Sequence, residues 1–255
     1  MKIFYSQLRN YIQNDPLSDW FNKMNQVYNH YKKDKKSSFH VELEMKSKKY
    51  KENFYSFLKN FHEYNLFQNL NDHQTQNEIN NKSIGIFIQC ELYHNEYNIL
   101  LKPDLIIHKD IFTEIFNEVD LNLPEYIIID ILYKTIHFNV DKNDIFNDLN
   151  IYYYKCKMLL CSQCIDKSYQ TGYFFAKEYR HKDIVLPKKE TIGHFKFDDS
   201  MIQKIKEGLG WIQNLNRYYD EWIIYPKPTI KELYPNMNIK YDKWYSEKKI
   251  LAEKI

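Results

Sequence analysis

The sequence predicts an α/β fold in which a small mixed β-sheet, made of a hairpin and central strands, is flanked by helices. Apolar residues have helical spacing in the first 64 residues and again after residue 200, and the runs between them are typical of strands. No repeat and no linker composition divides the chain, so we expect one domain over residues 1–255. It would comprise a helical part (1–83), a core sheet (84–180) and a second helical part (181–255).

Composition excludes several classes of protein. The 255 residues are 44% hydrophobic and 27% charged, enough to bury a core, and a net charge of +2 excludes a strongly basic, histone-like binder. The apolar runs are too short to cross a bilayer, and the first residues lack the apolar segment of a signal peptide. Four cysteines in a chain of this length do not form a disulfide scaffold. We therefore expect no membrane contact and a reducing intracellular compartment.

Two amphipathic helices are predicted in the first third of the chain. Apolar residues recur at helical spacing over 17–31, where Ser18 or Asp19 begins the helix, and again over 50–64. Nine lysines lie between Lys32 and Lys59, a run typical of a solvated face or of a wall that contacts phosphates. The stretch from 68 to 83 is polar and without periodicity, which predicts a loop.

The sheet is predicted from three segments. Residues 84–92 alternate in polarity and residues 99–107 follow a turn, so the two predict a β-hairpin. The segment 126–135 is nearly all apolar apart from Asp130, which is typical of a central strand covered on both faces. The other predicted elements are a short helix at 111–119, a helix at 144–160, a strand at 171–178, and helices at 200–218 and 242–255.

Two aspartates interrupt these apolar strands. Asp130 lies inside the central strand, where a carboxylate is costly to bury unless it is paired or bound to a metal. Asp104 interrupts the preceding strand, next to Pro103, which bends it. Carboxylates on neighbouring strands can share a divalent cation, and such hard oxygen ligands favour Mg²⁺ or Mn²⁺. The alternative is that both aspartates end strands near the surface.

The residues around these aspartates resemble a known family. The segments are Pro103-Asp104-Leu-Ile-Ile-His-Lys-Asp110, then Ile129-Asp130-Ile-Leu-Tyr-Lys-Thr135, Gly172-Tyr-Phe-Phe175, and the Pro-rich stretch 226–237. Their order and spacing resemble the PD-(D/E)XK nuclease superfamily, and within it the lambda-exonuclease/RecB-like branch found in large DNA viruses. The resemblance covers roughly residues 84–255.

This resemblance implies a restriction-endonuclease-like core with helical additions at both ends. It also implies a viral nuclease that hydrolyses DNA phosphodiester bonds with Mg²⁺ or Mn²⁺. Asp104 and Asp130 would be its catalytic metal ligands. Glu52 is the candidate third ligand, with Glu91 as the next choice. The candidate DNA contacts are Lys48, Lys49, Lys51, Lys102 and Lys155. A viral protein of this kind would act in the host cytoplasm or the virion.

The activity that the resemblance implies is exonuclease-like, acting from DNA ends. The sequence leaves open whether the substrate is DNA or RNA, whether cleavage is exonucleolytic or endonucleolytic, and what the oligomeric state is.

Two positions depart from the family pattern. The family's motif lysine lies two residues after the second aspartate, where this chain has Leu132. Residues i, i+2 and i+4 of a strand share a face, so we expect Lys134 to take that lysine's role. The family's Gln-x-x-x-Tyr helix motif is matched by Asp148 and Tyr152. These departures favour an alternative, a catalytically degenerate nuclease-fold protein that binds DNA or protein; an unrelated structural α/β protein is a third reading.

Cysteines and tryptophans offer weaker signals. One cysteine upstream (Cys90) and three downstream (Cys156, Cys161, Cys164) match the count of an iron–sulfur cluster in some RecB-like nucleases. Cys90 falls on the apolar face of its strand, so we expect buried thiols rather than a cluster, and a zinc site is the other alternative. The aromatic residues near the C-terminus predict core packing or base stacking: Trp211, Trp222, Tyr225 and Trp244.

Overall fold

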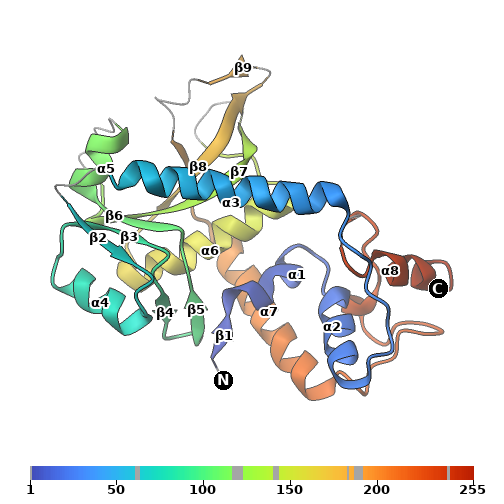
Figure 1. Ribbon diagram of the computed structural model, residues 1–255. Coiled ribbons are helices and arrows are strands. Elements are labelled where there is room, and N and C mark those ends of the chain that lie inside the picture. The colour runs from blue at the N-terminus through green and yellow to red at the C-terminus, as the bar shows by residue number, and fades with distance from the viewer. Residues whose placement is uncertain are drawn as a thin grey trace. The chain divides into compact units, whose positions relative to one another are not determined.

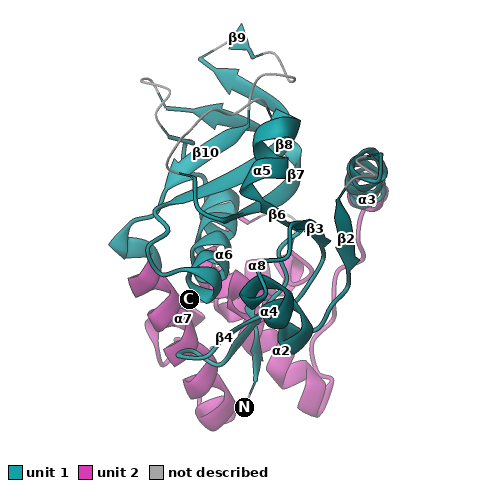
Figure 2. Ribbon diagram, turned by 90° about the vertical axis from the view of Figure 1, so that its left-hand side faces the viewer, with its two compact units in different colours: residues 1–5, 43–201 teal, residues 6–42, 202–255 magenta. Residues whose placement is uncertain are grey.

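The computed structural model describes residues 2–60, 64–116, 123–139, 144–182, 184–186, 192–239 and 242–255. It confirms an α/β fold with mixed sheets and with helices near both ends of the chain (Figure 1). The chain divides into two compact units, and each is built from separate stretches of sequence (Figure 2). Unit 1 comprises residues 1–5 and 43–201, and unit 2 comprises 6–42 and 202–255. The three consecutive parts predicted from the sequence do not coincide with these units.

Unit 1 is built on a mixed sheet with the strand order β10-β8-β7-β6-β3-β2 and with β9 paired to β8. Strands β3, β6 and β7 form an antiparallel meander, whereas β7 and β8 are parallel. The central position of β7 confirms the prediction for the apolar segment around Asp130. The strands are β2 (Asn65–Gln68), β3 (Gly85–Ile88), β6 (Leu105–His108), β7 (Tyr126–Phe138), β8 (Thr171–His181), β9 (Ile184–Val185) and β10 (Gly193–Lys196).

The predicted hairpin forms, but each of its strands is split in two. The inner halves, β4 (Leu92–His94) and β5 (Ile99–Leu101), pair with each other in a second sheet that includes β1 (Ile3–Phe4), while β3 and β6 pair in the large sheet. The break in the first strand lies at Gln89, whose φ of 51° is not an extended conformation. The break in the second lies at Pro103, which has no N–H to donate to a ladder. Asp104 therefore lies at the bend, directly before β6.

Helices cover both faces of the large sheet. Phe54 and Leu58 of α3 (Ser38–Leu58), with residues of α5 (Lys109–Phe116), pack on the face formed by the odd-numbered residues of β7, such as Ile129. Helix α6 (Leu149–Ile165) connects β7 to β8 and contacts the opposite face, where Tyr154 meets Phe174. Asp130 belongs to this second face because side chains alternate along a strand.

The stretch 68–83, predicted as a loop, contains helix α4 (Asp72–Asn80), so that prediction is wrong. Asn71 caps the helix by accepting from the Gln74 backbone N–H at 3.0 Å, and the Gln74 side chain accepts from the Asn71 N–H at 3.1 Å. Only Thr75 and Ile79 are buried. With so little apolar surface, the helix has no hydrophobic stripe to reveal it, and the capping box is its one sequence signal.

Unit 2 brings the two ends of the sequence into one core. The indole N–H of Trp20 donates to the Tyr219 carbonyl at 2.9 Å, Trp211 stacks on Trp222 with ring centroids 5.3 Å apart, and Trp244 is fully buried. Its elements are η1 (Tyr5–Leu8), α1 (Arg9–Ile12), α2 (Leu17–Tyr28), α7 (Asp199–Tyr218), η2 (Lys231–Leu233) and α8 (Tyr245–Ala252). Within the described ranges no helix is long and apolar enough to span a membrane.

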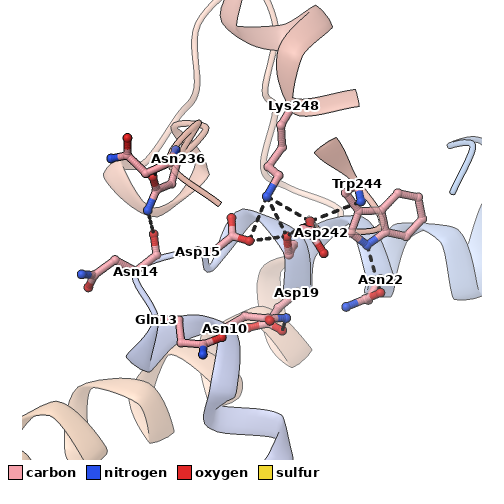
Figure 3. Close-up of polar contacts among 12 residues, drawn as sticks. Asn10, Gln13, Asn14, Asp15, Asp19, Asn22, Asn236, Asp242, Trp244 and Lys248 are labelled. Carbon is pink, nitrogen blue, oxygen red and sulfur yellow. Dashed lines mark hydrogen bonds and ion pairs between the residues drawn. The ribbon is translucent and has the colours of Figure 1, made fainter. Parts of the chain in front are cut away.

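A group of buried polar side chains links α2 to α8 inside unit 2 (Figure 3). The ammonium of Lys248, fully buried, lies 2.9 Å from Asp15 and 2.9 Å from Asp242. The Ser18 hydroxyl is 2.7 Å from Asp15 and 2.6 Å from Asp242. The Asp19 carboxyl group, in contrast, accepts hydrogen bonds from the neutral side chains of Asn10 and Trp211. Its protonation therefore affects stability differently.

Stability is expected to fall as pH rises from about 4 to about 7 because of Asp19. Burial raises the pKa of this carboxyl to about 7, against the hydrogen bonds from Asn10 at 2.6 Å and Trp211 at 3.0 Å, which lower it. The folded state therefore holds a proton that the unfolded state has lost, and unfolding is favoured as pH rises through this window. Urea unfolding at pH 4.5 and 7.5 measures the loss, and Asp19→Asn, which cannot ionise, should reduce it.

Candidate active site

Asp104 is held at the bend before β6 by four donor contacts. Its Oδ2 accepts from the Ile131 backbone N–H at 2.7 Å, and its two oxygens lie 2.7 and 2.6 Å from the Lys51 ammonium. The Tyr55 hydroxyl lies 3.4 Å from Oδ1. Asp104 is only 7% exposed, so these donors replace the water that a carboxylate needs.

Asp130 lies beside Asp104, one strand along the sheet. Its Oδ1 accepts from the backbone N–H of Asp104 at 3.0 Å, and both its oxygens lie 2.9 Å from the Lys157 ammonium. Asp130 is 1% exposed. Asp104 thus binds the backbone of β7 while Asp130 binds the backbone next to β6. These reciprocal bonds fix the two carboxylates relative to each other, as the sequence predicts for neighbouring strands.

The two lysines reach the carboxylates from different helices. Lys51 extends from α3, and Lys157 extends from α6 on the opposite face of the sheet. Burial and then the charge of Asp130 raise the pKa of Asp104, and Lys51 and Lys157 oppose that rise. Burial alone would lower the pKa of Lys157, but the charges of Asp130 and Asp104 outweigh it and raise that pKa. Lys157 therefore stays charged, and the two lysines bring an ammonium group to each of the two carboxyl groups.

The oxygens of Asp104 and Asp130 are suitable ligands for a hard divalent cation, because such cations prefer carboxylate oxygens. The structure does not bring a third acidic group to them: among the described residues, no three His, Cys, Asp or Glu side chains are grouped so as to hold a metal ion. The Glu52 side chain is 57% exposed and lies 3.8 Å from Lys48. Its neighbour Lys51 points to Asp104 instead, since successive helix residues point about 100° apart. Glu91 is likewise outside any such group.

Lys134, predicted to take the motif lysine's role, contacts Asp148 rather than either aspartate of the site. Its ammonium lies 3.1 Å from Asp148, whose other oxygen accepts from the Ile151 N–H at 2.8 Å and so caps α6. Lys134 is four residues beyond Asp130, about 13 Å along an extended strand, and β7 is irregular between Leu132 and Thr135. The lysine that approaches Asp130 is Lys157. Asp148 serves as a helix cap paired with Lys134.

Of the five lysines predicted to contact DNA, three are exposed and two contact carboxylates within the protein. Lys48, Lys49 and Lys102 are exposed. Lys51 is bound to Asp104. The assignment of Lys155 is corrected, because its side chain is fully buried and binds Asp144 at 3.0 Å and the Ile145 carbonyl at 2.7 Å.

Lys157 is the residue whose contact with Asp130 sequence reasoning missed. It lies in a helix with nine buried residues, where a second charged residue beside Lys155 is unusual. That contrast was a usable signal, because a lysine in a mostly apolar helix needs a carboxylate nearby. None of the four cysteines, all of which lie in the described ranges, forms a disulfide. Cys90, Cys156 and Cys161 are buried, and burial raises the pKa of Cys164 to about 12.

Two comparisons with known proteins gave no match. The chain matches no protein-family model, and no curated protein is significantly similar to it in sequence.

Proposed function

We propose that the protein is a metal-dependent nuclease that hydrolyses DNA phosphodiester bonds, with an exonuclease-like action. One observation carries the proposal: two buried carboxylates, Asp104 and Asp130, meet on adjacent strands with a charged lysine, Lys157, 2.9 Å from both oxygens of the second. Carboxylates for a metal and a cation for the phosphate are the groups that this reaction needs.

The order of elements around the site supports the proposal. Helix α3 is followed by the antiparallel strands β3, β6 and β7, then by helix α6 and the parallel strand β8. This order agrees with the restriction-endonuclease-like core that the sequence resemblance implies. Asp104 directly precedes the second of these strands and Asp130 lies in the third, as the two motif aspartates of the resemblance require.

Each residue has a separate role in the proposed reaction. Asp104 and Asp130 would hold Mg²⁺ or Mn²⁺, which when bound supplies an acidified water and stabilises the oxygens of the scissile phosphate. Lys157 replaces the lysine absent at Leu132 and stabilises negative charge that develops on the phosphate. Lys51 neutralises Asp104 and keeps the pair of buried carboxylates compatible with folding.

A second function, that of a nuclease-fold module that binds DNA or protein without cleavage, is favoured by another observation. Every oxygen of the two carboxylates accepts a hydrogen bond from a protein donor. In this case Lys51 and Lys157 take the place of the metal permanently, and their ammonium groups supply the positive charge that an ion would supply.

Calorimetry with Mn²⁺ tests the first function against the second. The wild type should release or absorb heat on binding, and Asp130→Asn should abolish that heat, because one of the two anionic ligands becomes neutral. Asp110→Asn is the matched control, since Asp110 is exposed and its carboxylate contacts His108 rather than the site. Circular dichroism checks that each variant is folded. Equal Mn²⁺ binding by the wild type and Asp130→Asn, or none by either, would contradict the metal site.

A further inference from the structure

The loop between α2 and α3 concentrates positive charge on unit 2. Residues 32–36 read Lys-Lys-Asp-Lys-Lys, and all four lysines are exposed. Asp34 is the only acidic residue of this run. A run of this kind can be a merely solvated segment, so what matters is whether the loop is ordered and whether its charge is already neutralised.

Hydrogen bonds to the α8 region hold the loop in place. The Asp34 N–H donates to the Lys243 carbonyl at 2.7 Å, and the Asp34 carboxylate accepts from the Ser246 N–H at 2.8 Å. The Lys32 N–H donates to the Glu247 carboxylate at 3.0 Å. The carboxylates of Asp34 and Glu247 are therefore used to bind backbone N–H groups.

Aromatic residues anchor the same loop. The Tyr31 ring lies 4.8 Å from Phe21, and the ammonium groups of Lys33 and Lys243 lie 5.6 and 6.0 Å from the centre of the Trp244 ring. Both cations thus approach one buried indole, which is an attractive arrangement for a cation and an aromatic face. This brings Lys243 next to the loop lysines and adds a charge from a distant part of the sequence.

Among the described residues of unit 2, four lysines of this surface have no carboxylate as an ion-pair partner. In the part of unit 2 that the structure describes, no carboxylate lies within ion-pair distance of the ammonium groups of Lys32, Lys33, Lys35 or Lys243. An ordered surface with several uncompensated lysines attracts a polyanion, and it does so without further rearrangement of the loop.

We infer that the loop 32–36 and Lys243 form a docking surface for the phosphate backbone of a nucleic acid. The identity of the polyanion rests on the proposed function, which requires DNA. A lipid surface is less well matched. The exposed apolar residues at the start of α3 form two pairs, Phe39 with Leu43 and Val41 with Met45, and these pairs lie on opposite sides of the helix. No single apolar face is available to enter a membrane there.

The inference is tested by measuring the affinity of the full-length protein for a 20-base-pair DNA duplex in EDTA. The affinity of each variant is measured over a range of salt concentrations. The loop variant combines Lys32→Gln, Lys33→Gln and Lys35→Gln, and its matched control combines Lys206→Gln, Lys227→Gln and Lys231→Gln, three other exposed lysines of unit 2. The loop variant should lose about tenfold or more in affinity, and its log–log salt slope should fall by about 2.7 units. The control should stay close to the wild type.

Two results would overturn the inference. One is equal affinity and equal salt slope in the loop variant and its control. The other is unchanged DNA binding with loss of binding to phosphatidylserine vesicles, which would assign the surface to a membrane. Because the assay contains no metal and measures no cleavage, a failure of the proposed nuclease activity leaves its result unaffected.

Discussion

Replacing Lys157 with methionine is expected to slow DNA cleavage by about two orders of magnitude or more, which corresponds to about 3 kcal/mol in the activation barrier. The ammonium lies 2.9 Å from both oxygens of Asp130 and remains charged, so it is the cation best placed to act beside that carboxylate. DNA affinity should change little, because one contact is a small part of binding to a polyanion. Single-turnover cleavage and duplex binding measure the two effects separately.

A second substitution distinguishes loss of the charge from loss of the fold. Leu132 lies two residues after Asp130, and residues at i and i+2 of a strand share a face, so Lys157→Met with Leu132→Lys returns an ammonium to the same side of β7. Cleavage should recover in this double variant. Lys134→Ala, which would slow cleavage if Lys134 had the motif lysine's role, should have little effect because Lys134 pairs with Asp148. A large loss in Lys134→Ala with none in Lys157→Met would reverse these roles.

The aspartate pair could be found from the sequence because it violates a pattern. A carboxylate within an apolar strand is conspicuous, and neighbouring strands of a sheet bring such residues together. Asp104 and Asp130 were predicted in this way, and the structure places them side by side. The helices with a clear apolar stripe, such as α2 and α7, were also predicted to within a few residues.

The partners of these aspartates could not be found in the same way. Lys51 and Lys157 approach from helices 53 and 27 residues away in sequence, and only the packing of those helices decides which residue faces the site. On α3 an error of one residue separates Glu52, the predicted ligand, from Lys51, the residue in contact. The split of the hairpin was equally hidden, because the positive φ of Gln89 has no signal in a residue that is not glycine.

Replacing Lys248 with methionine is expected to destabilise the protein by about 3–5 kcal/mol. Lys248 is fully buried and lies 2.9 Å from Asp15 and from Asp242, so its removal leaves two carboxylates together without a cation (Figure 3). Burial already raises the pKa of Asp15, an effect that Lys248 opposes. Urea unfolding of the full-length protein measures the change in free energy.

The adjacent residue supplies the control for this experiment. Lys249→Met removes the same charge from the same helix at an exposed position, where the expected change is within about 0.5 kcal/mol. Neutralising one carboxylate as well, with Lys248→Met and Asp242→Asn, should recover part of the lost stability, since repulsion between buried like charges is then removed. A loss of less than about 1 kcal/mol in Lys248→Met would show that water reaches the aspartates of unit 2. In that case the buried cation is not what joins α8 to α2.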